Sequence, residues 1–489
     1  MPNINSFISS HKVQSPADMN ACKTKVVAFN RVDSAVPAVK KTLSDHLQKY
    51  EALFTLRPES MRSLVQAMEE TFHKGLQKYG ETVPMIPTFV FGYADGTEMG
   101  EYLALDMGGT NLRVCLVSLK GQGKFEIKQT KYKLTEEQKH EDGQKLFDFC
   151  AQCLASFITD DLGRNPEDQA LPLSFTFSYP CTQTRIDHAE LIRWAKGFGA
   201  PNVEGHDVAA MFAKSLAKFD VPIKLTSIIS DTTGTLIASN YVDPNTKIGV
   251  IFGTGCNAAY METVGNIPKM KHLGMPDDQE MAISVARTRY DIIIDESSNK
   301  PREQIFEKMI AGLYLGEMFR LVLTEMIDAG DLFSGQDTNK LEKEYALDTS
   351  ILSLMESDPT DELLTVIGAF SYFFGIETTL EERRFFRSLA KLISTRAARL
   401  GACGLAAIVS KKGYLEKGCS IGADGSLYGK YPGFADRIHQ GFVDIFGEAG
   451  SYDEEAKGRQ TFSQPVTIRS AGLYQLSVYE KIEEYVEDA

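Results

Sequence analysis

The stretch EYLALDMGGTNLRVCLVSL, residues 101–119, places two β-rich runs on either side of a Gly-Gly turn. Alternating apolar residues are typical of strands, and a glycine pair between two such runs predicts a hairpin. Glycine lets the backbone approach a phosphate closely, and successive N–H groups can then point at it. A carboxylate at a strand end can hold Mg²⁺ through water. The residues with these features are Asp106, Gly108, Gly109, Thr110 and Asn111.

A second turn of the same kind lies in KIGVIFGTGCNAAYMET, residues 247–263. Its candidate phosphate-binding residues are Gly253, Thr254 and Gly255. One glycine turn is weak evidence, because glycine turns serve any hairpin. Two in one chain, each after an apolar strand, indicate a duplicated α/β core that clamps a nucleotide.

The surrounding sequence alternates between helix and strand patterns. Residues 35–79 have apolar residues at three- and four-residue spacing, which predicts two helices joined at Arg57-Pro58. LPLSFTFSYP, residues 171–180, has the near-continuous apolar character of a buried strand. From Gln304 onward the pattern is mostly helical. The chain is therefore predicted to be an α/β protein with mixed sheets.

Composition excludes several classes of protein. The 489 residues include 52 Lys plus Arg and 66 Asp plus Glu, a net charge of −14, which excludes a general nucleic-acid binder with a basic face. No apolar run approaches the ~20 residues that span a bilayer. The first residues lack a secretory signal. We expect an intracellular protein in the cytoplasm, with the mitochondrial surface and the nucleus as alternatives, and a monomer or a dimer.

The eight cysteines are scattered, as expected of reduced thiols. Cys150 and Cys153 form a CxxC within LFDFCAQCLASFI, whose apolar spacing is helical. Two thiols one turn apart on an apolar helix face are interpreted as packing residues. No second CxxC and no His pair lies nearby to complete a zinc site, so no protein-bound metal is predicted.

ISDTTGT, residues 229–235, places Asp231 after a strand and at the start of a helix. An Asp at this position can be an N-cap, which accepts hydrogen bonds from unpaired N–H groups. It can also be a general base for an alcohol that attacks a phosphoryl group. From this segment alone, the N-cap interpretation is favoured.

Several motifs together resemble the fungal hexokinase/glucokinase family, in order from about residue 35 to 445. They are LALDMGGTNLRV, LSFTFSYP, RWAKGFGAPNVEGHDV, ISDTTGTLIASNYVDPNTKIGVIFGTGCNAAY, FEKMIAGLYLGE, TRAARLGACGLAAI and IGADGSLYGKYPGF. The resemblance implies two lobes of the actin-like (ribonuclease H-like) ATPase fold, which close over a hexose and MgATP. The implied small domain is 82–229, to which 466–489 returns. The large domain is 230–465, with the N-terminal helices 35–81.

The resemblance also implies roles for individual residues. Asp231 matches the catalytic base. The sugar contacts implied by the family are Ser178, Lys196, Ser230, Asn257 and Glu307. The two glycine turns match the phosphate loops, and Gly425 and Ser426 match the adenosine segment.

The sequence departs from the family pattern within this site. Ser230 stands where the family has Asn, and Ala195 where it has Thr. The family carries a segment MAIN-CEWGAFD whose Glu binds the anomeric side of the sugar. Here MAISVARTRYDIIIDE, residues 281–296, leaves only three residues between the flanking matches, so that loop is missing. In the tail, Leu473 and Tyr474 replace the family's small residues.

These departures leave three interpretations open. The favoured one is a hexokinase-like regulator with weak or absent phosphorylation, similar to the atypical hexokinases of filamentous fungi that regulate extracellular protease production under carbon starvation. It would act through a protein partner. The second is an active hexokinase. The third is a kinase for another polyol or an amino sugar.

Overall fold

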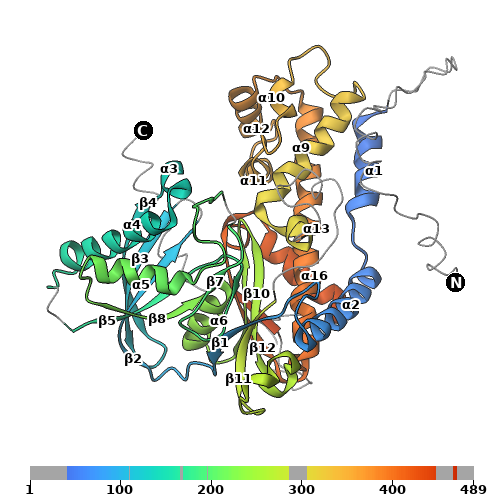
Figure 1. Ribbon diagram of the computed structural model, residues 1–489. Helices are drawn as coiled ribbons and strands as arrows, with labels where there is room; N and C mark the ends of the chain where they lie inside the picture. The colour runs from blue at the N-terminus through green and yellow to red at the C-terminus, as the bar shows by residue number, and fades with distance from the viewer. Residues whose placement is uncertain are drawn as a thin grey trace, which may run out of the picture. The chain divides into compact units, whose positions relative to one another are not determined.

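A computed structural model describes residues 41–108, 111–165, 169–194, 197–285, 305–447 and 466–470. The fold described here is that of the unit that begins at Thr42 (Figure 1). This unit contains two large mixed sheets, each with its own hydrophobic core, and a helical region built around one long helix. The α/β prediction is confirmed.

The first lobe is built on a five-stranded sheet in the order β4-β3-β2-β5-β8. Strands β2, β3 and β4 form an antiparallel meander, and β5 and β8 run parallel to β2. The predicted hairpin of residues 101–119 is therefore confirmed as β2 and β3. The bounds are β2 (Met99–Met107), β3 (Asn111–Lys120), β4 (Phe125–Lys133), β5 (Leu171–Thr176) and β8 (Ile223–Ile229).

Helices of the first lobe pack on this sheet and on each other. They are α3 (Glu136–His140), α4 (Gly143–Ser156), the π-helix η3 (Phe157–Asp161) and α5 (Val208–Lys218). A small sheet pairs β6 (Cys181–Thr182) with β7 (Glu190–Leu191). Cys150 and Cys153 are buried in α4, and burial raises the pKa of the Cys153 thiol to about 12. Their interpretation as packing residues is confirmed.

The second lobe is built on a six-stranded sheet in the order β1-β11-β10-β9-β12-β13. Strands β9, β10 and β11 form an antiparallel meander, and β12 and β13 run parallel to β9. Strand β1 adds to the far edge against β11. The bounds are β1 (Ile86–Phe91), β9 (Thr246–Phe252), β10 (Cys256–Thr263), β11 (Glu280–Ser284), β12 (Cys419–Asp424) and β13 (Val466–Ser470).

The two large sheets share one topology. Each has a three-stranded meander, followed by two strands parallel to the first strand of that meander. Strands β9 to β13 therefore correspond in order to β2, β3, β4, β5 and β8. Each glycine turn joins the first two strands of its meander. The predicted duplication is confirmed, and the turns occupy equivalent positions.

The position of β13 shows that the expected boundary between the two domains is wrong at the C-terminal end. Residues 466–489 were expected to return to the small domain, but Val466–Ser470 pairs with β12 of the second lobe. The reason is that β12 would otherwise present an unpaired edge, which β13 covers. The segment 86–91, assigned to the small domain, likewise belongs to the second lobe as β1. Residues 471–489 lie outside the described part.

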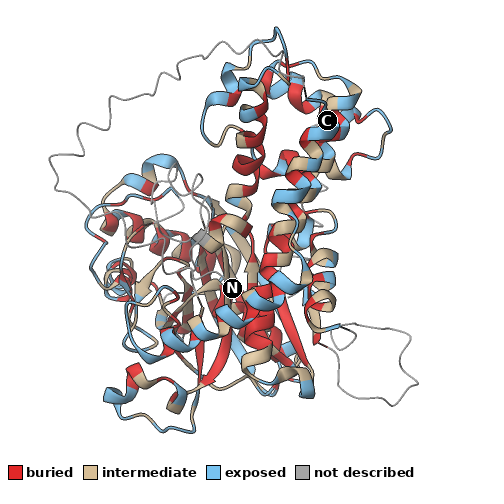
Figure 2. Cartoon of the chain, turned by 90° about the vertical axis from the view of Figure 1, so that its right-hand side faces the viewer, coloured by how far each residue is buried: buried red, intermediate tan, exposed pale blue. Residues whose placement is uncertain are grey.

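The two faces of the six-stranded sheet are covered by different helices. Ala259 and Met261 of β10 pack with Leu236 of α6 (Asp231–Val242), whereas Tyr260 joins the core cluster that contains α2 (Pro58–Gln77) and α13 (Leu380–Lys411). This division follows from the alternation of side chains along a strand. Figure 2 shows buried residues concentrated on the strands and on the helix sides that face them.

The helical region follows residue 304, as predicted. Helix α13 packs against α1, α2, α9, α11 and α16. It is long and apolar enough to cross a membrane by length and composition, but its apolar window is mostly buried within the protein, as in a core helix. The remaining bounds are η4 (Val264–Asn266), η5 (Pro268–Leu273), α8 (Ile305–Ile310), α9 (Gly312–Asp328), α10 (Asn339–Glu342), α11 (Thr349–Ser357), α12 (Leu364–Ala369), η6 (Phe370–Phe374), α14 (Tyr414–Lys417), α15 (Ser426–Lys430) and α16 (Phe434–Phe446).

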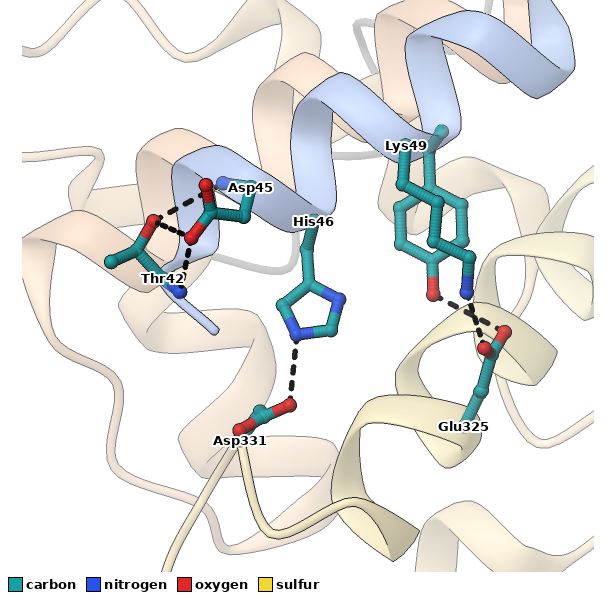
Figure 3. Close-up of polar contacts among 7 residues, drawn as sticks. Thr42, Asp45, His46, Lys49, Glu325 and Asp331 are labelled. Carbon is teal, nitrogen blue, oxygen red and sulfur yellow. Dashed lines mark hydrogen bonds and ion pairs between the residues drawn. The ribbon is translucent and has the colours of Figure 1, made fainter. Parts of the chain in front are cut away.

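Helix α1 (Leu43–Phe54) is joined to this region by polar contacts (Figure 3). A capping box between Thr42 and Asp45 starts the helix. One turn later, His46 Nε2 lies 2.8 Å from Asp331 Oδ2, and Lys49 pairs with Glu325 of α9. The predicted pair of N-terminal helices, interrupted before Pro58, is confirmed from Leu43 onward.

Candidate active site

Asp231 lies at the junction between β8 and α6, where the two lobes are connected. The N-cap of α6 is Ser230, whose hydroxyl accepts a hydrogen bond from the N–H of Thr233 at 3.4 Å. The expectation that Asp231 is itself the N-cap is therefore wrong by one residue. Ser is as good a cap as Asp, so the helix does not require the Asp231 carboxylate for this purpose. That carboxylate accepts a hydrogen bond from Thr232 N–H at 2.8 Å.

Ser178, which follows β5, lies next to Asp231. Its hydroxyl accepts a hydrogen bond from the backbone N–H of Asp231 at 3.1 Å. The predicted sugar contact Ser178 and the predicted base are thus adjacent. The carboxyl ends of the parallel strands β5 and β8 produce this proximity, since both chains leave the sheet at one edge.

The loop that carries the predicted sugar-binding lysine is held on both sides by aromatic rings. Trp194 stacks on Phe198 with centroids 5.3 Å apart and meets Tyr179 edge-on at 5.0 Å. The indole N–H also donates to the Ala200 carbonyl at 2.8 Å. Lys196 itself lies outside the described residues. Its neighbours fix the two ends of the loop next to the strand end that carries Ser178.

Asn257 and Glu307 approach the same edge from the second lobe. The Asn257 amide donates to Ser284 Oγ at 2.8 Å and to Thr232 Oγ1 at 3.3 Å, next to Asp231. Glu307 Oε1, on α8, accepts from the N–H of Cys256 at 3.1 Å. Burial raises the pKa of the Cys256 thiol, and the charges of Glu307 and Asp231 raise it further, because both carboxylates lie near the sulfur.

Glycines at the second turn and at the start of α15 lie close to their neighbours. A Cβ at Gly255 would lie 2.5 Å from Glu307 Oε1. Gly425 has φ of 107°, and a Cβ there would lie 2.4 Å from the Phe252 carbonyl oxygen. The start of α15, at Gly425 and Ser426, therefore packs directly against the β9–β10 turn. The predicted phosphate turn and the predicted adenosine segment are brought together.

The main chain of this turn is also fixed from α9. The N–H of Gly312 donates to the Gly253 carbonyl at 2.8 Å, and that of Leu313 donates to the Thr254 carbonyl at 3.2 Å. Within the turn, Gly253 N–H donates to Gly255 carbonyl at 2.9 Å. With its carbonyls engaged by α9, the turn is held rigidly at the edge of the sheet.

The first glycine turn is described only at its ends. Gly108 N–H donates to the Asn111 carbonyl at 3.0 Å, which closes the turn. Gly109 and Thr110 lie outside the described residues. Asp106, the last acidic residue before the turn, lies directly opposite Arg113 in the β2–β3 register, with Arg113 Nη1 3.6 Å from Asp106 Oδ2.

Two charged residues of this site were missed in the sequence. Arg113 has a buried Nε with no hydrogen-bond partner among the described residues. Asp424 ends β12, and burial raises the pKa of its carboxyl, with Asp231 adding to the rise and Arg113 opposing it. The charged groups of Asp424, Asp231 and Arg113 are therefore close enough to one another to interact electrostatically. A signal existed for Arg113, because antiparallel pairing across a tight turn puts it opposite Asp106.

This arrangement fits a nucleoside triphosphate with Mg²⁺. Gly253 in the second turn carries no side chain and its Cβ position meets nothing nearer than 3.7 Å, so the backbone there can be approached closely. Arg113 supplies a cation whose Nε has no partner within the described part of the chain, and Asp106 and Asp424 supply carboxylates for a hydrated cation. Bound there, Mg²⁺ would neutralise charge on the phosphates.

The segment in which the sequence predicts a missing sugar loop falls outside the described residues. Strand β11 ends at Ser284, and Val285 N–H still donates to the Ala258 carbonyl at 2.9 Å. Residues 286–304, where the shortened connection lies, are not described, and neither are Leu473 and Tyr474. The last residue of β11 before this connection is Ser284. Its Oγ lies 2.8 Å from the side-chain amide nitrogen of Asn257.

Comparisons with known proteins identify the family. Hexokinase family models match residues 46–241 and 247–463. Hexokinase-1 of Schizosaccharomyces pombe is 44% identical over 423 residues, which cover 84% of this chain and 87% of that protein. The chain belongs to the hexokinase family.

Further hexokinases show similar agreement. Hexokinase-1 of Saccharomyces cerevisiae is 44% identical over 435 residues, with 85% of this chain and 89% of that protein covered. A structure of the hexokinase from Schistosoma mansoni complexed with glucose matches with a TM-score of 0.76 and 29% identity, and it covers 88% of this chain and 97% of that one. The two-lobed hexokinase fold implied by the sequence motifs is thereby confirmed.

Proposed function

We propose that this hexokinase-family chain is an active ATP-dependent kinase that converts a hexose to its 6-phosphate. The observation that carries the proposal is the gathering of Asp231, Ser178, Asn257 and Glu307 next to the second glycine turn. Relatives named hexokinases at 44% identity support it, as does a similar structure complexed with glucose.

In the proposed reaction, Asp231 accepts the proton of the C6 hydroxyl as this oxygen attacks the terminal phosphorus of ATP. The new bond is O6–P, and the bond that breaks joins that phosphorus to the oxygen of the departing ADP. Asn257, Glu307, Ser178, Ser230 and Lys196 would hold the hydroxyl groups of the sugar. Arg113 and the N–H groups of the turns would face the charge that develops on the phosphoryl oxygens.

The altered sugar site is expected to weaken hexose binding. Hydrogen bonds are worth about 0.5–1.5 kcal/mol to neutral groups and about 1.5–3 kcal/mol to charged ones. Losing the glutamate contact, shortening Asn to Ser230 and removing the Thr hydroxyl at Ala195 total about 3–6 kcal/mol. At 1.4 kcal/mol per tenfold, this lowers affinity or turnover by roughly 10²–10⁴-fold. We therefore propose a hexokinase with a high KM for glucose.

A purely regulatory role remains the competing proposal, and it rests on the departures from the family pattern and on the resemblance to atypical hexokinases. The decisive experiment measures ADP formation with saturating MgATP and a wide range of glucose concentrations. Asp231→Ala is expected to lower turnover by about 10²–10⁴-fold, the contribution typical of a general base. Asp278→Ala changes an exposed carboxylate near β11 and is the matched control. Equal turnover in the wild type and Asp231→Ala would contradict the proposal and favour the regulator.

A further inference from the structure

A row of four hydrogen-bonded polar side chains lies beside Asp231, on the face of the six-stranded sheet that α6 covers. The Asn257 amide nitrogen of β10 lies 2.8 Å from Ser284 Oγ of β11 and 3.3 Å from Thr232 Oγ1 of α6. Thr232 Oγ1 in turn lies 3.0 Å from Ser230 Oγ. The reaction proposed above uses Asn257 and Ser230 as sugar contacts and gives no role to Thr232, which joins them.

The amide of Asn257 fixes the direction of these hydrogen bonds. Its Oδ1 accepts from the backbone N–H of Ala258 at 2.8 Å, so the amide oxygen and nitrogen cannot be exchanged. The nitrogen therefore faces Ser284 and Thr232, and an amide nitrogen can only donate. The Thr232 hydroxyl is consequently the acceptor of its bond with Asn257.

The Thr232 hydroxyl passes this direction on to Ser230. Thr232 is fully buried, with 0% of the residue exposed, so its hydroxyl hydrogen needs an acceptor within the protein. Ser230 Oγ is the acceptor that the described residues provide, and it also accepts from the N–H of Thr233 at 3.4 Å. Both lone pairs of Ser230 Oγ are then engaged by the protein. Ser230 can therefore offer a ligand only its hydrogen.

We infer that Thr232 is a positioning residue for the hexose, because it directs the hydroxyl hydrogen of Ser230 toward a sugar oxygen beside Asp231. Ser178 is arranged in the same sense, since its hydroxyl accepts from the N–H of Asp231 at 3.1 Å and keeps its own hydrogen for a ligand. Two donors thus adjoin the Asp231 carboxylate, an acceptor. This arrangement matches neighbouring hydroxyl groups, each of which both donates and accepts.

The inference rests on the proposed hexokinase activity and adds a residue that acts through Ser230 without touching the sugar. Its first test separates the hydroxyl of Thr232 from the methyl group. Thr232→Val loses the hydroxyl, whereas Thr232→Ser keeps it and loses the methyl. We expect kcat/KM for glucose to fall roughly 2-fold to 12-fold in Thr232→Val, the effect of one neutral hydrogen bond, and to stay at the wild-type value in Thr232→Ser. The KM for ATP should not change in either variant.

A role in packing alone predicts the reverse order, because Thr232→Ser removes a buried methyl group. A lower kcat/KM in Thr232→Ser than in Thr232→Val would therefore overturn the inference, as would an unchanged value in Thr232→Val. The matched control is Thr235→Val, at another buried threonine of α6, which should leave kcat/KM unchanged. If Thr232→Val does not fold, Thr232→Ala replaces it, since Ala and Ser differ only by the hydroxyl.

The second test asks whether Thr232 acts through Ser230. Once the Ser230 hydroxyl is removed, Thr232 has nothing left to orient. The double variant Ser230→Ala, Thr232→Val should therefore be no less active on glucose than Ser230→Ala alone. Two single effects that multiply in the double variant would mean that the residues act independently, which would contradict the inference.

Failure of the inference and failure of the proposed function give different results. Asp231-dependent turnover of glucose that Thr232→Val leaves unchanged removes only the positioning role. Absence of Asp231-dependent turnover removes the kinase itself. Calorimetric titration with glucose alone then tests the inference, since binding requires no phosphoryl transfer. Weaker binding to Thr232→Val than to Thr232→Ser supports it, and equal binding overturns it.

Discussion

The backbone N–H of Asp231 donates a hydrogen bond to the hydroxyl of Ser178 at 3.1 Å. This bond joins the second residue after β5 to the first residue of α6, and so it links the first lobe to the helix that covers the second sheet. The position of the proposed catalytic base therefore depends on a side chain from another strand. A hydroxyl that accepts this bond can still donate its own hydrogen to a sugar oxygen.

Ser178→Ala is expected to lower kcat/KM for hexose by roughly 2-fold to 12-fold, which corresponds to a neutral hydrogen bond of about 0.5–1.5 kcal/mol. Steady-state rates with glucose measure this effect. The matched control is Ser227→Ala, which removes a hydroxyl that bonds Ser174 at 2.8 Å within the same sheet. If both variants lose activity equally, Ser178 acts through the stability of the sheet and not through the site.

Arg113→Gln is expected to raise the KM for ATP by roughly 10-fold to 150-fold, because a charged hydrogen bond of about 1.5–3 kcal/mol is lost. The reason is that the buried Nε of Arg113 has no hydrogen-bond partner among the residues that the structure describes, and the guanidinium lies near the carboxylates of Asp106 and Asp424. Initial rates over a range of ATP concentrations provide the measurement. Arg164→Gln, which removes a pair with Glu101 on the same sheet, should leave the KM unchanged. An unaltered KM in Arg113→Gln would place the nucleotide elsewhere.

The sequence predicted the local features of this site better than the long-range ones. Both glycine turns, the strand that leads to Asp231 and the helices before residue 79 follow from short apolar patterns and turn residues. The partner of β13 could not be predicted, because pairing between strands far apart in sequence depends on which sheet edge is left open. Asp424 was missed for the same reason. Asp424 can be recognised as a site residue only when its neighbours in the fold, Arg113 and Asp231, are known.

The capping of α6 shows a second limit. The sequence predicts Asp231 as the cap, but the side chain of Ser230, one residue earlier, can accept the same bond. The hydrogen bond from Thr233 N–H to Ser230 Oγ resolves this. Sequence reasoning also placed Asn257 in the sugar site without its partners. Ser284 and Thr232, which orient its amide, come from two other elements.

Asp424→Asn is expected to stabilise the protein at neutral pH. Burial raises the pKa of the Asp424 carboxyl, so the folded protein binds this proton more tightly than the unfolded chain does. Wild-type stability is consequently lost as pH rises above the unfolded pKa of about 3.9. Unfolding temperatures between pH 3 and 7 should show a gain for Asp424→Asn at pH 7 that vanishes near pH 3. The exposed-site control Asp278→Asn should show no such trend. A loss of stability at pH 7 would contradict the prediction.

For Lys269, the predicted change of stability with pH has the opposite sign. Its buried ammonium donates to the carbonyls of Gly75, Pro84 and Met85 at 2.6–2.7 Å, and burial lowers its pKa to about 8. Because the unfolded chain, with a pKa of about 10.4, binds this proton more tightly, wild-type stability rises as pH increases from 8 toward 10.4.

Lys269→Met should abolish that rise. At pH 7 it should also cost about 1–3 kcal/mol for each carbonyl left buried without a donor. Urea unfolding at pH 7 and pH 9.5 measures both effects, and Lys271→Met, at an exposed neighbour, should reproduce neither. A variant as stable as the wild type at pH 7 would mean that water replaces the ammonium at all three carbonyls.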